Sequence, residues 1–97
     1  MMYLVLIEMD LSAIPKDPKE RMNIMTPLIE MTKKDLESGE LKMAGLSPDG
    51  RNGFVISTQD EKTLYSRAQI LAPYTKCKVM PMLTFDEAMD LMKEMKQ

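Results

Sequence analysis

The sequence contains no histidine, no tryptophan and only one cysteine. Without histidine there is no imidazole to activate a serine or cysteine nucleophile, to hold a haem iron or to complete a typical catalytic zinc site. The single cysteine, Cys77, cannot close an internal disulfide. Three tyrosines and two phenylalanines are the only aromatic residues, too few for a base-stacking platform. These absences predict a protein that uses no metal and no cofactor.

The chain also lacks a strong charge of one sign. Its 13 basic and 15 acidic residues are scattered and give a net charge of -2. Nucleic acids and anionic membranes are bound by clustered basic faces, so neither is an expected partner. The apolar run at 3–7 is too short to span a bilayer, and no secretory signal is recognisable. We therefore expect a cytoplasmic protein.

Three short motifs predict where helices begin. In each, an N-cap residue stands three positions before a glutamate, so that each side chain can bond to the other residue's backbone N–H. The motifs run from Asp17 to Glu20, from Thr58 to Glu61 and from Thr84 to Glu87. They predict helices over 18–38, 59–71 and 85–97.

The first two predicted helices have an apolar side with helical spacing. For the helix over 18–38 these residues are Met22, Met25, Ile29 and Leu36, and for the helix over 59–71 they are Leu64, Ala68 and Leu71. The first helix is expected to end at Gly39, which tolerates the left-handed conformation. Pro27 lies inside it and predicts either a kink or a late start with Thr26 as the cap.

Strands are predicted at 3–7, 41–46, 54–57 and 77–83. The first is apolar without alternation, which is typical of a central strand buried on both faces. The last contains Pro81, which removes a backbone donor and favours an edge position. The turn-rich segment 48–53 predicts a hairpin between the middle two strands.

The predicted order of elements, β-α-β-β-α-β-α, indicates an α+β fold in one domain over 1–97. With right-handed crossovers it gives a ferredoxin-like βαββαβ sandwich, with the sheet in the order 4-1-3-2 and an additional C-terminal helix. Two helices cover only one face of such a sheet. We expect a second copy of the sheet to cover the other face, with the terminal helix as the alternative.

Three segments carry a resemblance to a known superfamily: GELKMAG at 39–45, PDGRNGF at 48–54, and PY at 73–74 leading into KVMPML at 78–83. With these segments the chain resembles the dimeric α/β-barrel superfamily, in particular its muconolactone-isomerase-like and YCII-like proteins. The resemblance implies two ferredoxin-like sheets paired face to face in a homodimer or higher homo-oligomer. The superfamily includes isomerases, cofactor-free monooxygenases and haem-handling enzymes. The histidine of the YCII-like His-Asp pair is absent here.

Four residues are candidates for a small-molecule site. Glu8 ends the first strand on the face opposite Tyr3, and a desolvated carboxylate there would act as a proton shuttle. The alternative is a side chain that is solvated or paired with a lysine such as Lys78. Arg51 would hold a ligand carboxylate, or serves only the turn that contains it. Tyr3 and Tyr74 would donate hydrogen bonds to a ligand, or pack their rings with the oxygen in water.

Sulfur is abundant only as methionine. Twelve methionines suggest Cu(I) binding, because thioethers are soft ligands. Methionine also fills cores and interfaces. Packing is therefore the favoured interpretation for the side of the terminal helix that carries Met89, Met92 and Met95. Cys77 lies between two lysines that would activate its thiol. Strand alternation places both lysines on the other face, so we expect Cys77 to act as a small core residue.

Two functions remain in view. The first is a small-molecule-binding protein with cofactor-independent, isomerase-like proton transfer in a cleft between the helices and the sheet. Glu8 would be its base, with Tyr3, Arg51 and Tyr74 as ligand-binding residues, and its ligand a small organic carbonyl or lactone-like compound. The second is a non-catalytic oligomerisation module. The fold alone does not decide between these two functions.

Overall fold

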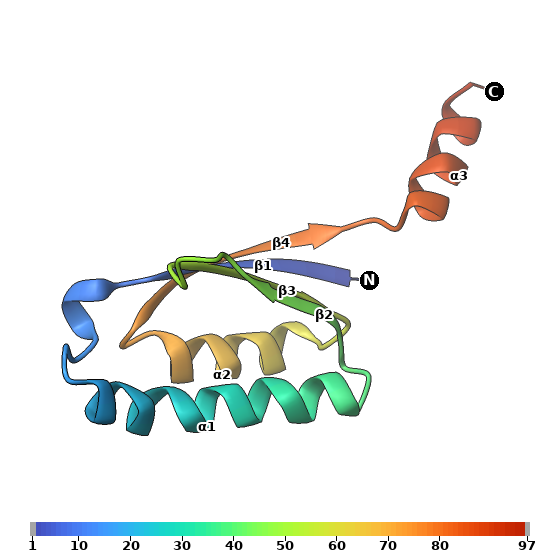
Figure 1. The fold of residues 1–97 in the computed structure, drawn as a ribbon. Coiled ribbons are helices and arrows are strands. Elements are labelled where there is room, and N and C mark those ends of the chain that lie inside the picture. Colours follow the sequence, from blue (N-terminus) through green and yellow to red (C-terminus); the bar gives the residue numbers. More distant parts are fainter. Residues whose placement is uncertain (1, 97) are drawn as a thin grey trace.

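The computed structural model describes residues 2–96, and it contains every predicted element in the predicted order. The elements are β1 (Met2–Met9), a short 3-10 turn (Leu11–Ala13), α1 (Pro18–Glu37), β2 (Leu41–Leu46), β3 (Asn52–Ser57), α2 (Glu61–Leu71), β4 (Thr75–Met82) and α3 (Phe85–Met95) (Figure 1). No helix in residues 2–96 has both the length and the apolar character needed to cross a membrane.

The four strands form one antiparallel sheet in the order β2-β3-β1-β4, which is 4-1-3-2 when read from the β4 edge. The predicted α+β class is confirmed, and the arrangement is compatible with a ferredoxin-like sandwich. β1 is central, and β4 is an edge strand whose Pro81 lies opposite Tyr3. A proline is tolerated there because the edge strand needs no donor on its outer side.

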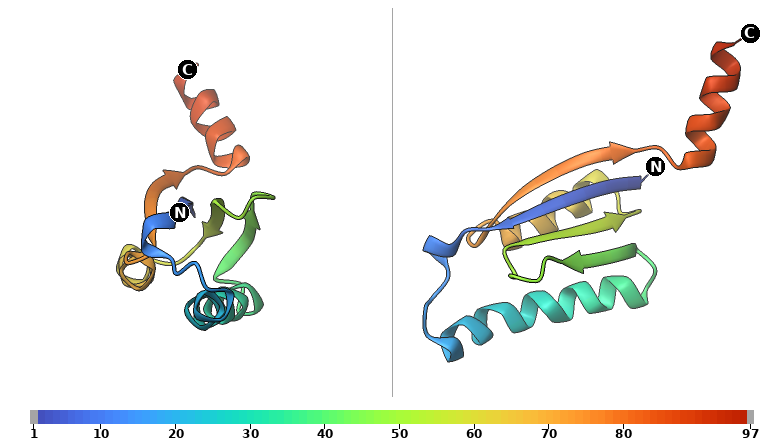
Figure 2. Two further views of the ribbon diagram at one scale, coloured as in Figure 1. Left: turned by 60° about the vertical axis from the view of Figure 1, so that its left-hand side comes forward. Right: turned by 45° about the horizontal axis from the view of Figure 1, so that its top comes forward.

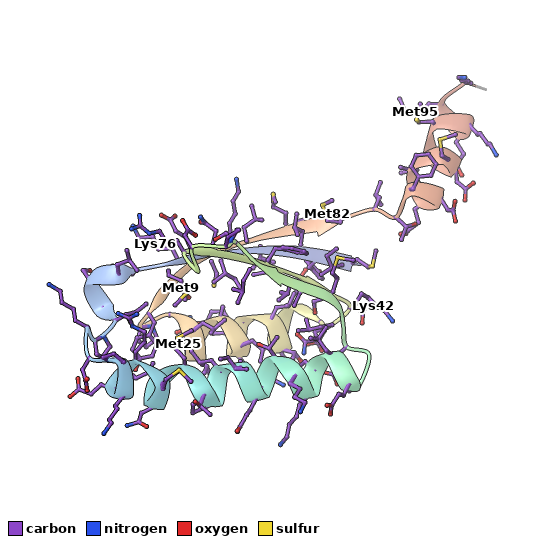
Figure 3. All side chains as sticks on the ribbon, in the orientation of Figure 1. Met9, Met25, Lys42, Lys76, Met82 and Met95 are labelled. Carbon is purple, nitrogen blue, oxygen red and sulfur yellow. The ribbon has the colours of Figure 1, made fainter. Side chains whose placement is uncertain are left out.

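Helices α1 and α2 both lie on one side of the sheet, here called the covered face (Figures 1 and 2). Along β1 the side chains alternate, so Tyr3, Val5 and Ile7 point to the helices. The other side is the open face. Lys76 and Met82 project from the open side in Figure 3, whereas Met9 points to the helix side.

The core lies between the covered face and α2. Tyr3, Val5 and Leu64 form its buried centre, with Ile7, Val55 and Cys77 packed around them. As predicted, Leu64, Ala68 and Leu71 of α2 face inward, and Cys77 is on the covered face. The core is thin: the buried apolar residues among those described are Tyr3, Val5, Leu28, Leu41 and Leu64.

The apolar side predicted for α1 is not the side that the structure buries. Met22 and Ile29 are more than half exposed, while Leu28 and Asp35 are buried. The inward residues do keep a helical spacing, but one of them is an aspartate, so the apolar pattern pointed to the wrong side. The helix also continues through Pro27, so a late start at Thr26 is wrong.

One of the three predicted capping boxes is present in full. The hydroxyl of Thr84 accepts from the N–H of Glu87, and the carboxylate of Glu87 accepts from the N–H of Thr84. At α2 the cap is Asp60, which accepts from the Thr63 N–H at 2.8 Å, because the helix begins two residues later than predicted. The side chain of Asp17 makes no capping hydrogen bond at α1.

Helix α3 stands clear of the sheet and of the other two helices (Figures 1 and 2). It gives the molecule principal extents of 60 × 25 × 23 Å. Within Phe85–Met95 no residue is buried. The alternative in which the terminal helix covers the open face is therefore not the arrangement in this structure.

Candidate functional site

Three of the four candidate residues lie at one end of the sheet. Glu8, near the end of β1, is opposite Asn52 of β3 and Lys76 of β4. The next N–H along the chain, of Met9, donates to the carbonyl oxygen of Arg51 at 2.8 Å. The N–H of Asp10 donates to the carbonyl oxygen of Tyr74, also at 2.8 Å. Backbone hydrogen bonds at the end of β1 thus place the backbones of Arg51 and Tyr74 next to the two residues that follow Glu8.

Glu8 itself is solvent-exposed on the open face. Its direct cross-strand neighbour is Lys76, while Lys78 is opposite Leu6. In residues 2–96 the ion pair closer than 4.0 Å joins two other residues, so the alternative of a Glu8–Lys78 pair is not found. An exposed carboxylate lacks the desolvation that would make it an effective base. Glu8 would need a partner surface over it to gain that environment.

Arg51 lies in the hairpin turn, where Asp49 organises the backbone. A carboxylate oxygen of Asp49 accepts from the Arg51 N–H at 3.0 Å and from the hydroxyl of Ser47 at 2.6 Å. Both hydrogen bonds lower the pKa of Asp49, and the bond from Ser47 has the larger effect. The turn role predicted as the alternative is present, and the exposed Arg51 side chain remains accessible.

Tyr3 does not join the other three residues. It lies at the other end of β1 on the covered face, about 17 Å from Glu8 at the usual rise along a strand. Its hydroxyl donates to Glu61 Oε1 at 3.0 Å. That hydrogen bond, with desolvation and the charges of Glu61 and Asp60, raises the pKa of Tyr3. The hydroxyl therefore serves to link β1 to the start of α2.

An ion pair between α1 and α2 escaped the sequence analysis. Arg67 Nε donates to Asp35 Oδ2 at 3.0 Å, and Arg67 Nη2 donates to Asp35 Oδ1 at 3.1 Å. Asp35 is only 7% exposed, and its carboxylate is the main cause of a raised Arg67 pKa. The available signal was spacing, because Asp35 is seven residues after Leu28 and Arg67 is three residues after Leu64.

A second buried polar group lies beside this pair. The fully buried Ser57 hydroxyl donates to Gln59 Oε1 at 3.1 Å, and Gln59 Nε2 donates to Glu40 Oε2 at 3.0 Å. The charge of Glu40 also contributes to the raised pKa of Arg67. Among residues 2–96, no buried side-chain nitrogen or oxygen lacks a hydrogen-bond partner. These contacts join the end of β3 and the loop before α2 to the loop before β2.

The space between the covered face and the helices is a cavity of about 50 Å³. Its walls are mainly apolar, with Asp35, Gln59 and Arg67 as polar residues at its edge. Pockets for small organic ligands usually measure about 300–1,000 Å³. The cavity between the helices and the sheet is smaller than that range. Two more open hollows reach it: one of about 360 Å³ beside the Asp35–Arg67 ion pair, and one of about 480 Å³ beside Tyr3 and the start of α2.

Residues 2–96 contain no group of three or more histidine, cysteine or acidic side chains positioned to hold a metal ion. The thiol of Cys77 lies 3.5 Å from the hydroxyl of Thr75 and lines the small cavity. Both lysines that flank Cys77 in sequence are on the open face, as strand alternation predicts.

Comparison with known proteins does not add a family. No family model matches the sequence. No curated protein matches it either.

Proposed function

We propose that this protein is a self-assembling module in which two copies join through the open faces of their sheets. The product would be a homodimer of ferredoxin-like domains, of the kind implied by the resemblance to dimeric α/β barrels. Of the two functions expected from the sequence, the geometry favours assembly over catalysis in a single chain.

The observation that carries this proposal is the apolar character of the open face. Eight apolar side chains from all four strands share that face and are here called the open-face patch. The cross-strand register assigns to it Met2, Leu4, Leu6, Met43, Phe54, Ile56, Met80 and Met82. Among them Leu6 is 41% and Met43 is 54% exposed. A sheet face that meets water is normally polar, and a continuous apolar patch marks an interface.

Within the patch, the ring of Phe54 lies close to the backbone of the neighbouring strand. Phe54 lies opposite Gly45, and a Cβ atom on Gly45 would overlap the Phe54 ring. The glycine therefore allows a large aromatic side chain to lie flat over the neighbouring strand. A flattened apolar surface of this kind suits packing against another sheet.

The total surface of the chain supports the same proposal. It exposes 7385 Å², whereas a compact protein of 11.1 kDa is expected to expose about 5,700 Å². The radius of gyration is 16.0 Å, compared with about 12.5 Å for a compact chain of this length. A standard protein interface buries about 800 Å² on each partner. The area that the chain exposes beyond the value for a compact protein is therefore larger than the area that one such interface buries on each partner.

The shared position of Glu8, Arg51 and Tyr74 favours a second candidate function. A partner sheet over the open face would enclose the side of Glu8 that now meets water. These strand ends would then lie at the rim of a chamber between subunits, with Glu8 as the base for a small carbonyl or lactone-like compound. Loss of ligand-induced thermal stabilisation in Glu8→Gln, with unchanged folding, tests this candidate against a panel of such compounds.

Sedimentation equilibrium of two matched variants tests the assembly proposal. Leu6→Lys puts a charge on the open face, and Ile29→Lys puts the same charge on the exposed side of α1, where Ile29 is 55% exposed. We expect the wild-type protein to be a dimer, Leu6→Lys to raise its Kd by about 100-fold or more, and Ile29→Lys to leave the Kd within about twofold. A wild-type monomer, or equal effects of the two variants, would contradict the proposal.

A further inference from the structure

We infer that α3 is an arm that packs its apolar side onto a second copy of this chain, next to the open-face patch. This inference rests on the proposed dimer and adds a second contact to it. The occupant of the exposed side of α3 would thus be neither the sheet of its own chain nor an unrelated protein.

The residues of α3 divide cleanly between two sides. At 100° per residue, Phe85, Ala88, Met89, Met92 and Met95 fall on one side, with Asp86, Asp90 and Glu94 on the other. The apolar side is not covered: Phe85 is 77% and Met95 is 85% exposed. An isolated helix of this length is marginal in water, and the apolar side of an amphipathic helix is what stabilises it through packing. The helix therefore needs a surface to lie on.

Its own sheet is poorly placed to supply that surface. Only Leu83 and Thr84 connect β4 to α3. Thr84 has an extended backbone, with φ −66° and ψ 160°, and the capping box with Glu87 fixes the direction in which the helix leaves. α3 accordingly extends past the end of the sheet on the open-face side (Figures 1 and 2). Folding back onto its own sheet would require a reversal at this capped start.

The apolar side of α3 continues the open-face patch. Met82 belongs to the patch and is 41% exposed, Leu83 follows at 50% and Phe85 begins the helix at 77%. Exposed apolar side chains therefore occur on both sides of Thr84, at the end of β4, in the connector and at the start of α3. A second chain packed on the open face would contact these residues at the edge of the interface. Burying them would add to the solvent-accessible area that the sheet-to-sheet contact buries.

Two variants of α3 in the full chain test the inference. Met92→Gln makes the apolar side polar, and Asp90→Gln places the same good helix former on the acidic side. Sedimentation equilibrium should give a dimer Kd at least about tenfold higher for Met92→Gln, because each dimer loses two apolar contacts. Asp90→Gln should remain within about twofold of the wild-type Kd.

Hydrogen exchange of the α3 amides supplies a second measurement. We expect protection above the dimer Kd and loss of protection below it. A wild-type dimer whose Kd is unchanged in Met92→Gln would overturn the arm and leave the sheet-to-sheet dimer standing. A wild-type monomer would overturn both, and protection of α3 in that monomer would identify its own sheet as the covering surface.

Discussion

The two faces of the sheet are built from the same strands and both carry apolar side chains, but α1 and α2 lie over only one of them. The open face also carries Glu8, Lys76 and Lys78 at one end. Val5 lies on the covered face at 6% exposure, and the next residue, Leu6, lies on the open face at 41%. α1 and α2 supply the cover for Val5, while α3, which would be the third helical cover, extends away (Figure 2). The contrast indicates which burial the chain provides for itself and which it leaves to another molecule.

The strongest test of this contrast substitutes the two neighbours on β1. Val5→Lys buries a charge under the helices and should cost more than about 4 kcal/mol, enough to prevent folding of a small domain. Leu6→Lys should retain native circular dichroism and a cooperative thermal transition, because its side chain can extend into water. If the protein is a monomer and both variants lose the same free energy of unfolding, the open face is as buried as the core and the contrast is wrong.

A second comparison lies within α2. Leu64→Ala removes a core side chain that is 6% exposed and should lower the free energy of unfolding by about 2–5 kcal/mol. Ile70→Ala, at a position that is 48% exposed, should change it by no more than about 0.5 kcal/mol. Urea denaturation of both variants measures the two values. Equal losses would mean that α2 presents a different side to the sheet.

The ion pair between the two covering helices is a third point of comparison. Asp35→Asn keeps the shape of the side chain but leaves the Arg67 guanidinium without its charged partner. Because Arg67 retains some access to water, with 34% of its side chain exposed, we expect a loss of about 1–2 kcal/mol rather than the larger cost of a fully buried pair. Glu30→Gln, at an exposed position on the same helix, is the control and should be neutral.

The smallest expected effect concerns acid. Hydrogen bonds from Thr63 lower the pKa of Asp60 in the folded protein, so the ionised carboxylate is more stable there than in the unfolded chain. This stabilisation is present above the unfolded pKa near 4 and is lost as the pH falls below it. The thermal midpoint should therefore decline less between pH 4 and pH 2 in Asp60→Asn, which caps α2 without titrating. An identical decline of the thermal midpoint in the variant and the wild-type protein would mean that other groups cause the acid sensitivity.

The spacing of helix caps and apolar runs was sufficient to predict the order of elements, the α+β class, the central β1 and the edge position of β4. These features depend on local chemistry, such as the reciprocal cap at Thr84 and the left-handed Gly39 at φ +83°. The inward side of α1 was predicted wrongly because it depends on a contact between distant residues. Asp35 is acceptable there only because Arg67, 32 positions later, reaches it.

The candidate site was predictable only in part, for a related reason. Glu8 was assigned correctly to the face opposite Tyr3, because alternation along a strand is local. The proximity of Arg51 and Tyr74 to the end of β1 depends on pairing with β3 and β4, which a single strand does not reveal. The function of Tyr3 as a hydrogen-bond donor to Glu61 depends on where α2 begins, two residues later than its pattern suggested.

Native mass spectrometry of the freshly purified full-length chain tests the central claim, that the open face is covered by a second copy. We predict a dimer, and a bound small molecule would appear in the same spectrum as additional mass, in support of the chamber at Glu8. A monomer at concentrations well above the micromolar range would contradict the account.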